Sequence, residues 1–269
     1  MAVDEAVVRA IEQREAIPTI RVFGWDPPAV SFGYAQRIQR EIDPEKCRHE
    51  GIDIVRRASG GRAVLHWNEL TYSILCAADD PLLGGSIKES YRKISACLVA
   101  GIRSLGIDAR FEPAHRKVPG PRADTLTSPC FSTTTQYEIT VQGKKLVGSA
   151  QRRLGDMLLQ HGSFLLGPEH RKIVDLFPDT QQNLKQRFKK QLQEKTISLS
   201  ETGSDLEFPE IAEAISRGFT DTLGLTLETG SLSSYEKQLT EHLVDTKYGT
   251  KDWNFRESEM DSTAICPLA

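Results

Sequence analysis

The spacing of hydrophobic residues predicts a chain that begins with a helix and continues mainly as strands. Val3, Val7 and Ile11 recur at helical spacing, so we expect a first helix that ends before Pro18. Short apolar runs bounded by Gly, Pro or Asp predict the strands of the first two thirds of the chain. These predicted strands cover residues 19–23, 29–34, 52–56, 69–76, 137–141, 145–151 and 157–166.

Helices are predicted between and after these strands. Ser86 and Glu89 form a capping-box pattern, and one apolar face follows from Ile87 to Leu105. Later helical patterns cover residues 178–195, 209–223 and 233–245. The order of elements predicts an α+β fold with a mixed, largely antiparallel sheet and helices packed on it. We expect a catalytic domain at residues 1–228 and a C-terminal helix and tail at 229–269.

Composition restricts the classes of function. The chain has 269 residues, 39% hydrophobic and 26% charged, and a net charge of -3, which disfavours general nucleic-acid binding. No run reaches the roughly 18–20 apolar residues that a membrane span needs. The acidic N-terminus is not of the secretory type. Five cysteines without paired spacing predict neither a disulfide framework nor a metal site, and they favour the reducing cytoplasm.

The segment RRASGGRAVLH contains the first candidate binding loop. Gly60 and Gly61 let backbone amides approach a ligand, and successive exposed amides form an anion-binding concavity. Arg56, Arg57 and Arg62 are expected to add positive charge around it. A turn in a solvated basic loop is the simpler interpretation of an isolated glycine pair.

A second candidate segment, KKLVGSAQRRLGDMLLQHGS, follows a polar loop that contains PCF. Cys130 in that loop lies among Ser, Thr and Pro, a setting in which a thiol stays accessible. Neighbouring strand residues point to opposite faces, so Lys144 and Lys145 cannot both face one pocket. His66 and His161 are each interpreted either as a general base or as a residue that holds a loop.

Together, SGGRAVLH, KLVGSAQRR and LLQHGS resemble the lipoate-protein ligase and octanoyltransferase family, whose fold is that of the biotin/lipoyl protein ligase catalytic domain. The resemblance covers Met1 to about Trp253. The position of CF at 130–131 resembles the cysteine-dependent branch, which transfers octanoyl from acyl carrier protein to lipoyl domains. Members usually carry a strand before the segment that matches MAVDEA, so either the start is placed late or a sheet edge is exposed.

This resemblance implies a site, a mechanism and partners. Cys130 is implied as the nucleophile that carries the acyl group as a thioester, with Lys145 stabilising the thiolate and oxyanion. The implied partners are acyl carrier protein, the lipoyl domains of 2-oxoacid dehydrogenases and the glycine cleavage H protein. No cofactor and no metal are expected. The residues expected to bind substrate are Arg57, Gly60, Gly61, Arg62, His66, Gly148, Ser149, Ala150, His161 and Gly162.

Other functions remain open at this point. An ATP-dependent lipoate or octanoate ligase would use the same loop for an acyl-adenylate, with ATP and Mg²⁺ as cofactors and Arg56 and Arg57 on its phosphate. The KYGTKDWNF tail weakly resembles ligases. A lipoyl or octanoyl amidotransferase acting from H protein, or a non-catalytic binder of lipoyl domains, is the further alternative. For the acyl chain, Val64, Leu65, Tyr72 and Val147 are the residues expected to line an apolar tunnel.

Overall fold

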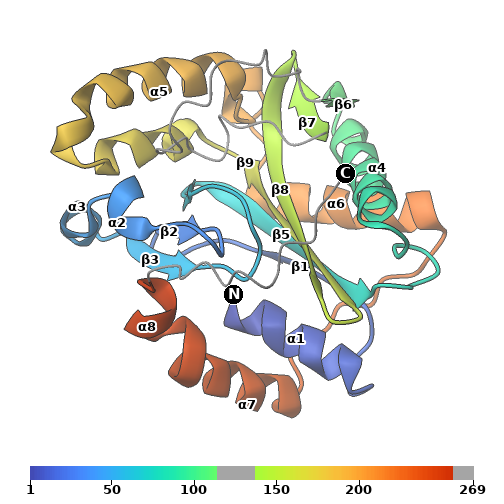
Figure 1. Ribbon diagram of the computed structural model, residues 1–269. Coiled ribbons are helices and arrows are strands. Elements are labelled where there is room, and N and C mark those ends of the chain that lie inside the picture. Colours follow the sequence, from blue (N-terminus) through green and yellow to red (C-terminus); the bar gives the residue numbers. More distant parts are fainter. Residues whose placement is uncertain (114–136, 257–269) are drawn as a thin grey trace.

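A computed structural model describes residues 1–113 and 137–256. Its centre is a six-stranded sheet in the order β1-β5-β9-β8-β7-β6, in which every pair of neighbours is antiparallel. The strands are β1 (Thr19–Phe23), β5 (Glu69–Ala77), β6 (Ala109–Pro113), β7 (Tyr137–Val141), β8 (Lys144–Leu154) and β9 (Met157–Leu165). The long strands β5, β8 and β9 form the middle of the sheet (Figure 1).

A second, three-stranded sheet lies beside the first. It contains β2 (Ala29–Phe32), which runs parallel to β3 (Asp53–Arg56) and antiparallel to β4 (Val64–His66). The glycine segment connects β3 to β4, and β5 follows β4 directly, so this small sheet carries the first candidate loop to the large sheet. The α+β class with a mixed, largely antiparallel sheet is confirmed.

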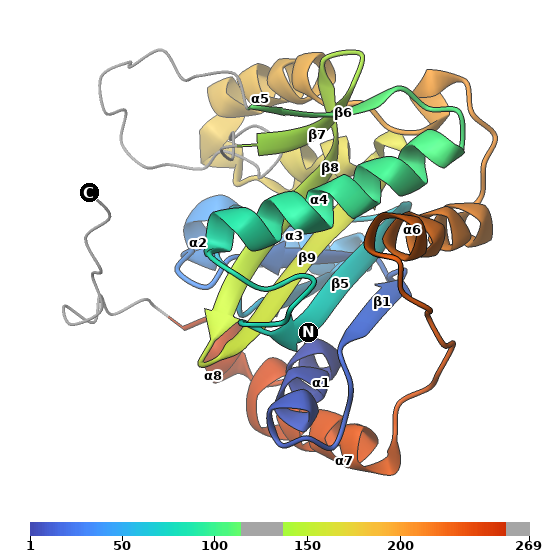
Figure 2. The ribbon, with the colours of Figure 1, turned by 90° about the vertical axis from the view of Figure 1, so that its right-hand side faces the viewer.

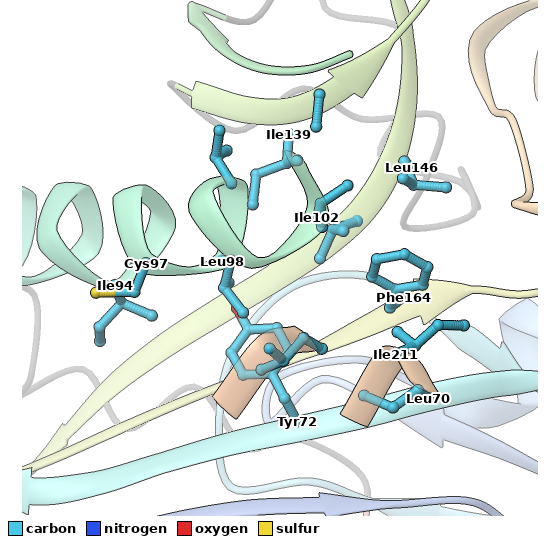
Figure 3. Close-up of a cluster of buried hydrophobic side chains, with 14 of the residues drawn as sticks. Leu70, Tyr72, Ile94, Cys97, Leu98, Ile102, Ile139, Leu146, Phe164 and Ile211 are labelled. Atoms are coloured by element: carbon cyan, nitrogen blue, oxygen red, sulfur yellow. The ribbon is translucent and has the colours of Figure 1, made fainter. Parts of the chain in front are cut away.

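Two helices cover one face of the large sheet. They are α4 (Ile87–Ser104) and α6 (Phe208–Leu223), which cross in front of the strands in Figure 2. The predicted capping box starts α4, with Ser86 and Glu89 each bonded to the other's backbone. The helices enclose the main hydrophobic core, in which Tyr72 and Phe164 pack with Leu98 and Ile211 (Figure 3). All four residues expected to line an acyl tunnel are core residues: Tyr72 and Val147 here, and Val64 and Leu65 in the core beneath the small sheet.

The opposite face of the sheet is covered in parts. Helix α1 (Ala2–Glu12) packs on Leu75, Met157 and Leu159, and α7 (Ser234–Leu243) packs on α1. The small sheet, a 3₁₀ helix at Pro168–Leu176 and α5 (Gln182–Lys195) form a separate core. Between these two parts lies the stretch of β5 and β9 that carries the candidate site.

Several elements depart from the predicted pattern. Strands β4 and β6, the 3₁₀ helix and α8 (Lys251–Asn254) were not predicted, because three- to nine-residue elements give little periodicity. The helix expected over 178–195 begins as 3₁₀ at Asp179–Gln181 and becomes α-helical at Gln182. The remaining short helical elements in the described residues are α2 (Ile38–Glu41), α3 (Pro44–His49), a 3₁₀ turn at Ser200–Thr202 and a π-helical turn at Val244–Tyr248. Among the helices that the structure describes, none has the length and apolar content to cross a bilayer.

Candidate active site

A small pocket of about 30 Å³ lies where the small sheet meets the middle of the large sheet. It brings together parts of the glycine segment and of the second candidate segment, and the segment that contains Cys130 lies outside the described residues. Its lining residues are Met1, Ser31, Arg57, Val64, His66, Thr71, Gly148, Ser149, Ala150, His161, Gly162 and Ser163. A larger surface hollow of about 580 Å³ lies by the β7–β8 turn, and none of the residues singled out in the sequence lines it. The chemistry therefore points to the smaller pocket.

The glycine loop is shaped by Arg57, which is buried. Its guanidinium donates to the carbonyls of Gly60 and Arg62, at 2.9 and 2.7 Å, and to that of Ser31 at 2.9 Å. Gly61 has a φ of +98°, a conformation that only glycine adopts without strain. Among the described residues that line the pocket, Arg57 is present and Gly60 and Gly61 are not. The glycine loop therefore borders the pocket through Arg57.

Arg56 does not contribute charge to this site, which corrects the expectation from the sequence. Its buried guanidinium donates to backbone carbonyls of the β2–α2 loop and of α8. These acceptors are the carbonyl oxygens of Gly33, Tyr34, Gln36, Trp253, Asn254 and Arg256. Burial lowers the pKa of Arg56 to about 10. The residue fixes the C-terminal helix to the small sheet and is not available to a substrate phosphate.

His66 is held on both sides of its ring. Its Nε2 lies 2.6 Å from Ser31 Oγ, and its Nδ1 lies 2.7 Å from Glu69 Oε1. The ring also stacks on Trp25, with 4.4 Å between centroids. Glu69 and Ser31 were not among the predicted site residues.

The sequence did contain a signal for these missed residues. Glu69, Thr71 and Ser73 alternate along a strand whose residues from Glu69 to Cys76 are all buried. Alternation places them on one face. Polar groups on a buried strand face need partners, and Thr71 and Ser163 both donate to the Glu69 carboxylate.

His161 occupies a different position, nearer to the glycine loop. Its Nε2 lies 2.5 Å from Ser59 Oγ, and its Nδ1 is 3.9 Å from Asp4 Oδ2. Burial lowers the pKa of His161, so the ring is neutral at physiological pH. Because Ser59 belongs to the glycine loop and is fully buried, His161 fixes that loop to β9.

Lys145 and Lys144 lie in different environments, as strand alternation predicts. Lys145 is 3% exposed and its Nζ is 3.0 Å from Glu138 Oε1, whereas Lys144 is partly exposed and donates to Gln193 O. A register shift between β7 and β8 pairs Ile139 with Val147 but Thr140 with Lys145.

The shift inserts one extra residue of β8 between these pairs. Val147 packs in the main core, and simple alternation would put Lys145 on that same face. The extra residue reverses this, so Lys145 lies on the face that carries the pocket. It is not among the residues that line the pocket itself.

The floor of the pocket is formed by the registers of β5, β9 and β8. Gly162 pairs with Tyr72 on one side and with Ser149 on the other. A Cβ at Gly162 would lie 2.5 Å from Tyr72 Cε1 and 2.6 Å from Gly148 O, so only glycine fits. Among the described residues, the part of β8 from Gly148 onward pairs with β9 and with no other strand. Every second backbone amide of this part therefore points away from β9.

The thiols that the structure describes are unsuited to nucleophilic catalysis. Cys47, Cys76 and Cys97 are fully buried, and burial raises their pKa values to about 12, 12 and 11. Cys130 and Cys266 lie outside the described residues, as does the long loop expected at 116–129. Within residues 1–113 and 137–256, no three His, Cys, Asp or Glu side chains are grouped as metal ligands.

Comparison with known proteins identifies the family of the chain. The family model of the lipoyl protein ligase A/B catalytic domain matches residues 1–220. The chain belongs to this family. It is 42% identical over 260 residues to a protein named octanoyltransferase LipM from Kyrpidia tusciae, covering 96% of this chain and 94% of that one. It is 36% identical to the Bacillus subtilis protein of the same name, with 95% and 93% covered.

Solved structures of this family share the fold. A lipoate-protein ligase A described as bound with ATP superposes with a TM-score of 0.75 at 26% identity, covering 96% of this chain and 93% of that one. A bipartite lipoate protein ligase from Thermoplasma acidophilum gives 0.76 at 24% identity, with 97% and 92% covered. The chain is thus an acyltransferase of the lipoylation family, as the sequence motifs predicted.

Proposed function

We propose that this protein transfers an octanoyl group from octanoyl-acyl carrier protein to a lysine of lipoyl domains or H protein, through a thioester on Cys130. The observation that carries the proposal is the near full-length similarity to proteins named octanoyltransferase. The three buried free thiols favour a reducing compartment, so we assign the reaction to the cytoplasm. No nucleotide is needed, because the conversion of a thioester to an amide is downhill.

In the first half-reaction, the Cys130 thiolate attacks the carbonyl carbon of the donor thioester. The new C–S bond forms, the donor sulfur leaves, and the octanoyl group remains on the enzyme. A free thiol has a pKa of about 8.5, so a neighbouring cation is needed to raise the thiolate fraction. Lys145 suits this role because it is buried on the pocket face, and β7, which carries its partner Glu138, directly follows the segment with Cys130.

The oxyanion of each tetrahedral intermediate needs donors with fixed positions. The ammonium group of Lys145, which carries three N–H donors, is the side-chain candidate. Alternate amides of Gly148 to Ala150 that point away from β9 are the backbone candidates. Val64, which lines the pocket, is the apolar contact expected for the acyl chain.

An ATP-dependent ligase is the second candidate. The ATP-bound relative of the same fold favours it. The engagement of Arg56 with backbone carbonyls disfavours it, because one of the two arginines expected on an adenylate phosphate is not available. Transfer from H protein to other lipoyl domains would follow the same thioester chemistry with a different donor.

One assay separates these functions. Enzyme and apo-lipoyl domain are incubated either with octanoyl-acyl carrier protein without ATP, or with free octanoate, ATP and Mg²⁺, and the acceptor is weighed by mass spectrometry. We expect the octanoyl mass on the acceptor in the first mixture. Modification in the second mixture alone would replace the transferase with the ligase.

The role of Lys145 has its own test with a matched control in the neighbouring Lys144. Iodoacetamide alkylation of Cys130 is followed across pH in a Cys266→Ala background, where the buried thiols react slowly because their pKa values are raised. Lys145→Ala should move the alkylation midpoint to higher pH because the thiolate loses its cation. Lys144→Ala should leave it in place, and equal midpoints for the two variants would contradict the assignment.

A further inference from the structure

The hydrogen bonds around His66 form a continuous chain that ends at the pocket. We propose that Ser31, His66 and Glu69 are a proton relay that takes the proton from the attacking amine in the second half-reaction. Ser31 and His66 line the pocket, and Glu69 lies behind them, 4% exposed. The inference rests on the proposed function, because it assigns the base for aminolysis of the acyl-enzyme.

The partners of Glu69 determine how the ring is protonated. One carboxylate oxygen accepts from Thr71 Oγ1 at 2.5 Å and faces His66 Nδ1 at 2.7 Å, and the other accepts from Ser163. Thr71 Oγ1 in turn accepts from Trp25 Nε1 at 2.8 Å, so its own proton points to Glu69. A carboxylate with these neighbours acts only as an acceptor. His66 Nδ1 therefore carries a proton, and in the neutral ring Nε2 is an acceptor.

Ser31 completes the chain on the pocket side. Arg57 Nη1 donates to Ser31 Oγ at 3.1 Å, and Ser31 Oγ lies 2.6 Å from His66 Nε2. Since a guanidinium can only donate, the serine proton points to Nε2. The hydroxyl oxygen keeps a lone pair for a proton from the pocket, and His66 Nε2 behind it accepts the serine's own proton.

His161 has a similar serine neighbour but lacks these features. Ser59, its partner, is not among the residues that line the pocket, and the nearest carboxylate oxygen of Asp4 is 3.9 Å from Nδ1. A carboxylate at that distance does not fix the tautomer by a hydrogen bond. The serine–histidine pair at His161 therefore holds a loop, whereas the serine–histidine pair at His66 reaches the pocket.

The relay accounts for the proton that the attacking amine must lose during aminolysis. The neutral lysine amine attacks the thioester carbonyl, a C–N bond forms, the C–S bond breaks, and Cys130 leaves as a thiolate. The extra proton on nitrogen passes to Ser31 Oγ while the serine's own proton moves to His66 Nε2. The resulting imidazolium is stabilised by Glu69 and later releases its proton to solvent or to the thiolate.

The two half-reactions provide an internal control. Enzyme acylation is followed by intact mass after mixing with octanoyl-acyl carrier protein, and transfer by single-turnover mixing of isolated acyl-enzyme with apo-lipoyl domain. For Ser31→Ala and Glu69→Gln we expect near wild-type acylation and a transfer rate lowered by about 10²-fold, within the usual range for general base catalysis. His170→Gln, at another buried histidine–hydroxyl pair (2.8 Å to Thr196), should leave both rates unchanged.

A spectroscopic signature separates positioning from packing. In protein with ¹⁵N-labelled histidine, His66 should show a protonated Nδ1 and an unprotonated Nε2 in the wild type, and Glu69→Gln should shift population to the other tautomer. A wild-type ring with its proton on Nε2 would overturn the relay. So would transfer within about threefold of wild type in both variants, or equal slowing of both half-reactions. Failure of the wild type to form an acyl-enzyme would instead overturn the proposed function.

Discussion

Replacing Gly162 with alanine should destabilise the middle of the sheet. The added Cβ would lie 2.5 Å from Tyr72 Cε1 and 2.6 Å from Gly148 O, closer than real Cβ contacts come. Tyr72 is fully buried in the main core, so its ring cannot move into solvent. Its hydroxyl also bonds to Ser149 Oγ at 2.6 Å and to Gln160 Nε2 at 3.2 Å, and a displaced ring would lose these contacts.

The size of the effect follows from these contacts. Overpacking a well-filled core costs about 1–3 kcal/mol, and each lost hydrogen bond about 0.5–1.5 kcal/mol. We therefore expect the free energy of unfolding to fall by about 3 kcal/mol. For a chain of 269 residues, this lowers Tm by roughly 6–12 °C.

Calorimetry and urea denaturation of Gly162→Ala measure this loss. Gly60→Ala is the matched control, because a Cβ there meets nothing within 4 Å. Tyr72→Leu is the second background, in which Gly162→Ala should cost less because the ring that it meets is gone. A Gly162→Ala loss as small as that of Gly60→Ala would refute the close approach of β9 to Tyr72.

Three further changes test other parts of the structure. Gly61→Val should abolish transfer because its φ of +98° excludes a side chain, while Gly60→Ala, where a Cβ meets nothing within 4 Å, should leave the fold intact. Burial, with the charge of a neighbouring arginine, lowers the pKa of His170 to about 4, so stability should fall by about 3 kcal/mol as pH drops from 6.5 to 4. This dependence should be absent from urea curves of His170→Gln. Arg56→Met should cost more than about 3 kcal/mol in urea, because several buried carbonyls lose their donor.

Local signals in the sequence were sufficient for most elements. The capping box at Ser86 and Glu89 gives the start of α4, and helical spacing gives its buried face. The hairpin around residues 142–143 follows from its glycine turn between two apolar strands. The family motifs then indicated the fold, and two of them, KLVGSAQRR and LLQHGS, lie in strands that the hydrophobic pattern had already placed.

Long-range contacts were not accessible in the same way. The Arg56 guanidinium donates to backbone carbonyls up to 200 positions away in the chain. Local sequence therefore could not show that its charge has a structural role. The register shift between Lys145 and Val147 is set by pairing with β7, and no residue pattern in KKLVGSA indicates it. Glu69 and Thr71 did alternate visibly, but their meaning depends on Ser31 and Ser163 from other strands.

The measurement that tests the central claim most directly is the mass of the enzyme after mixing with octanoyl-acyl carrier protein in the absence of ATP. The account predicts one octanoyl adduct, located on Cys130 by peptide mapping, present in Cys266→Ala and absent from Cys130→Ala. Addition of apo-lipoyl domain should remove the adduct and place the octanoyl group on the acceptor lysine. An adduct that persists in Cys130→Ala, or acceptor octanoylation that proceeds in that variant at the wild-type rate, would contradict it.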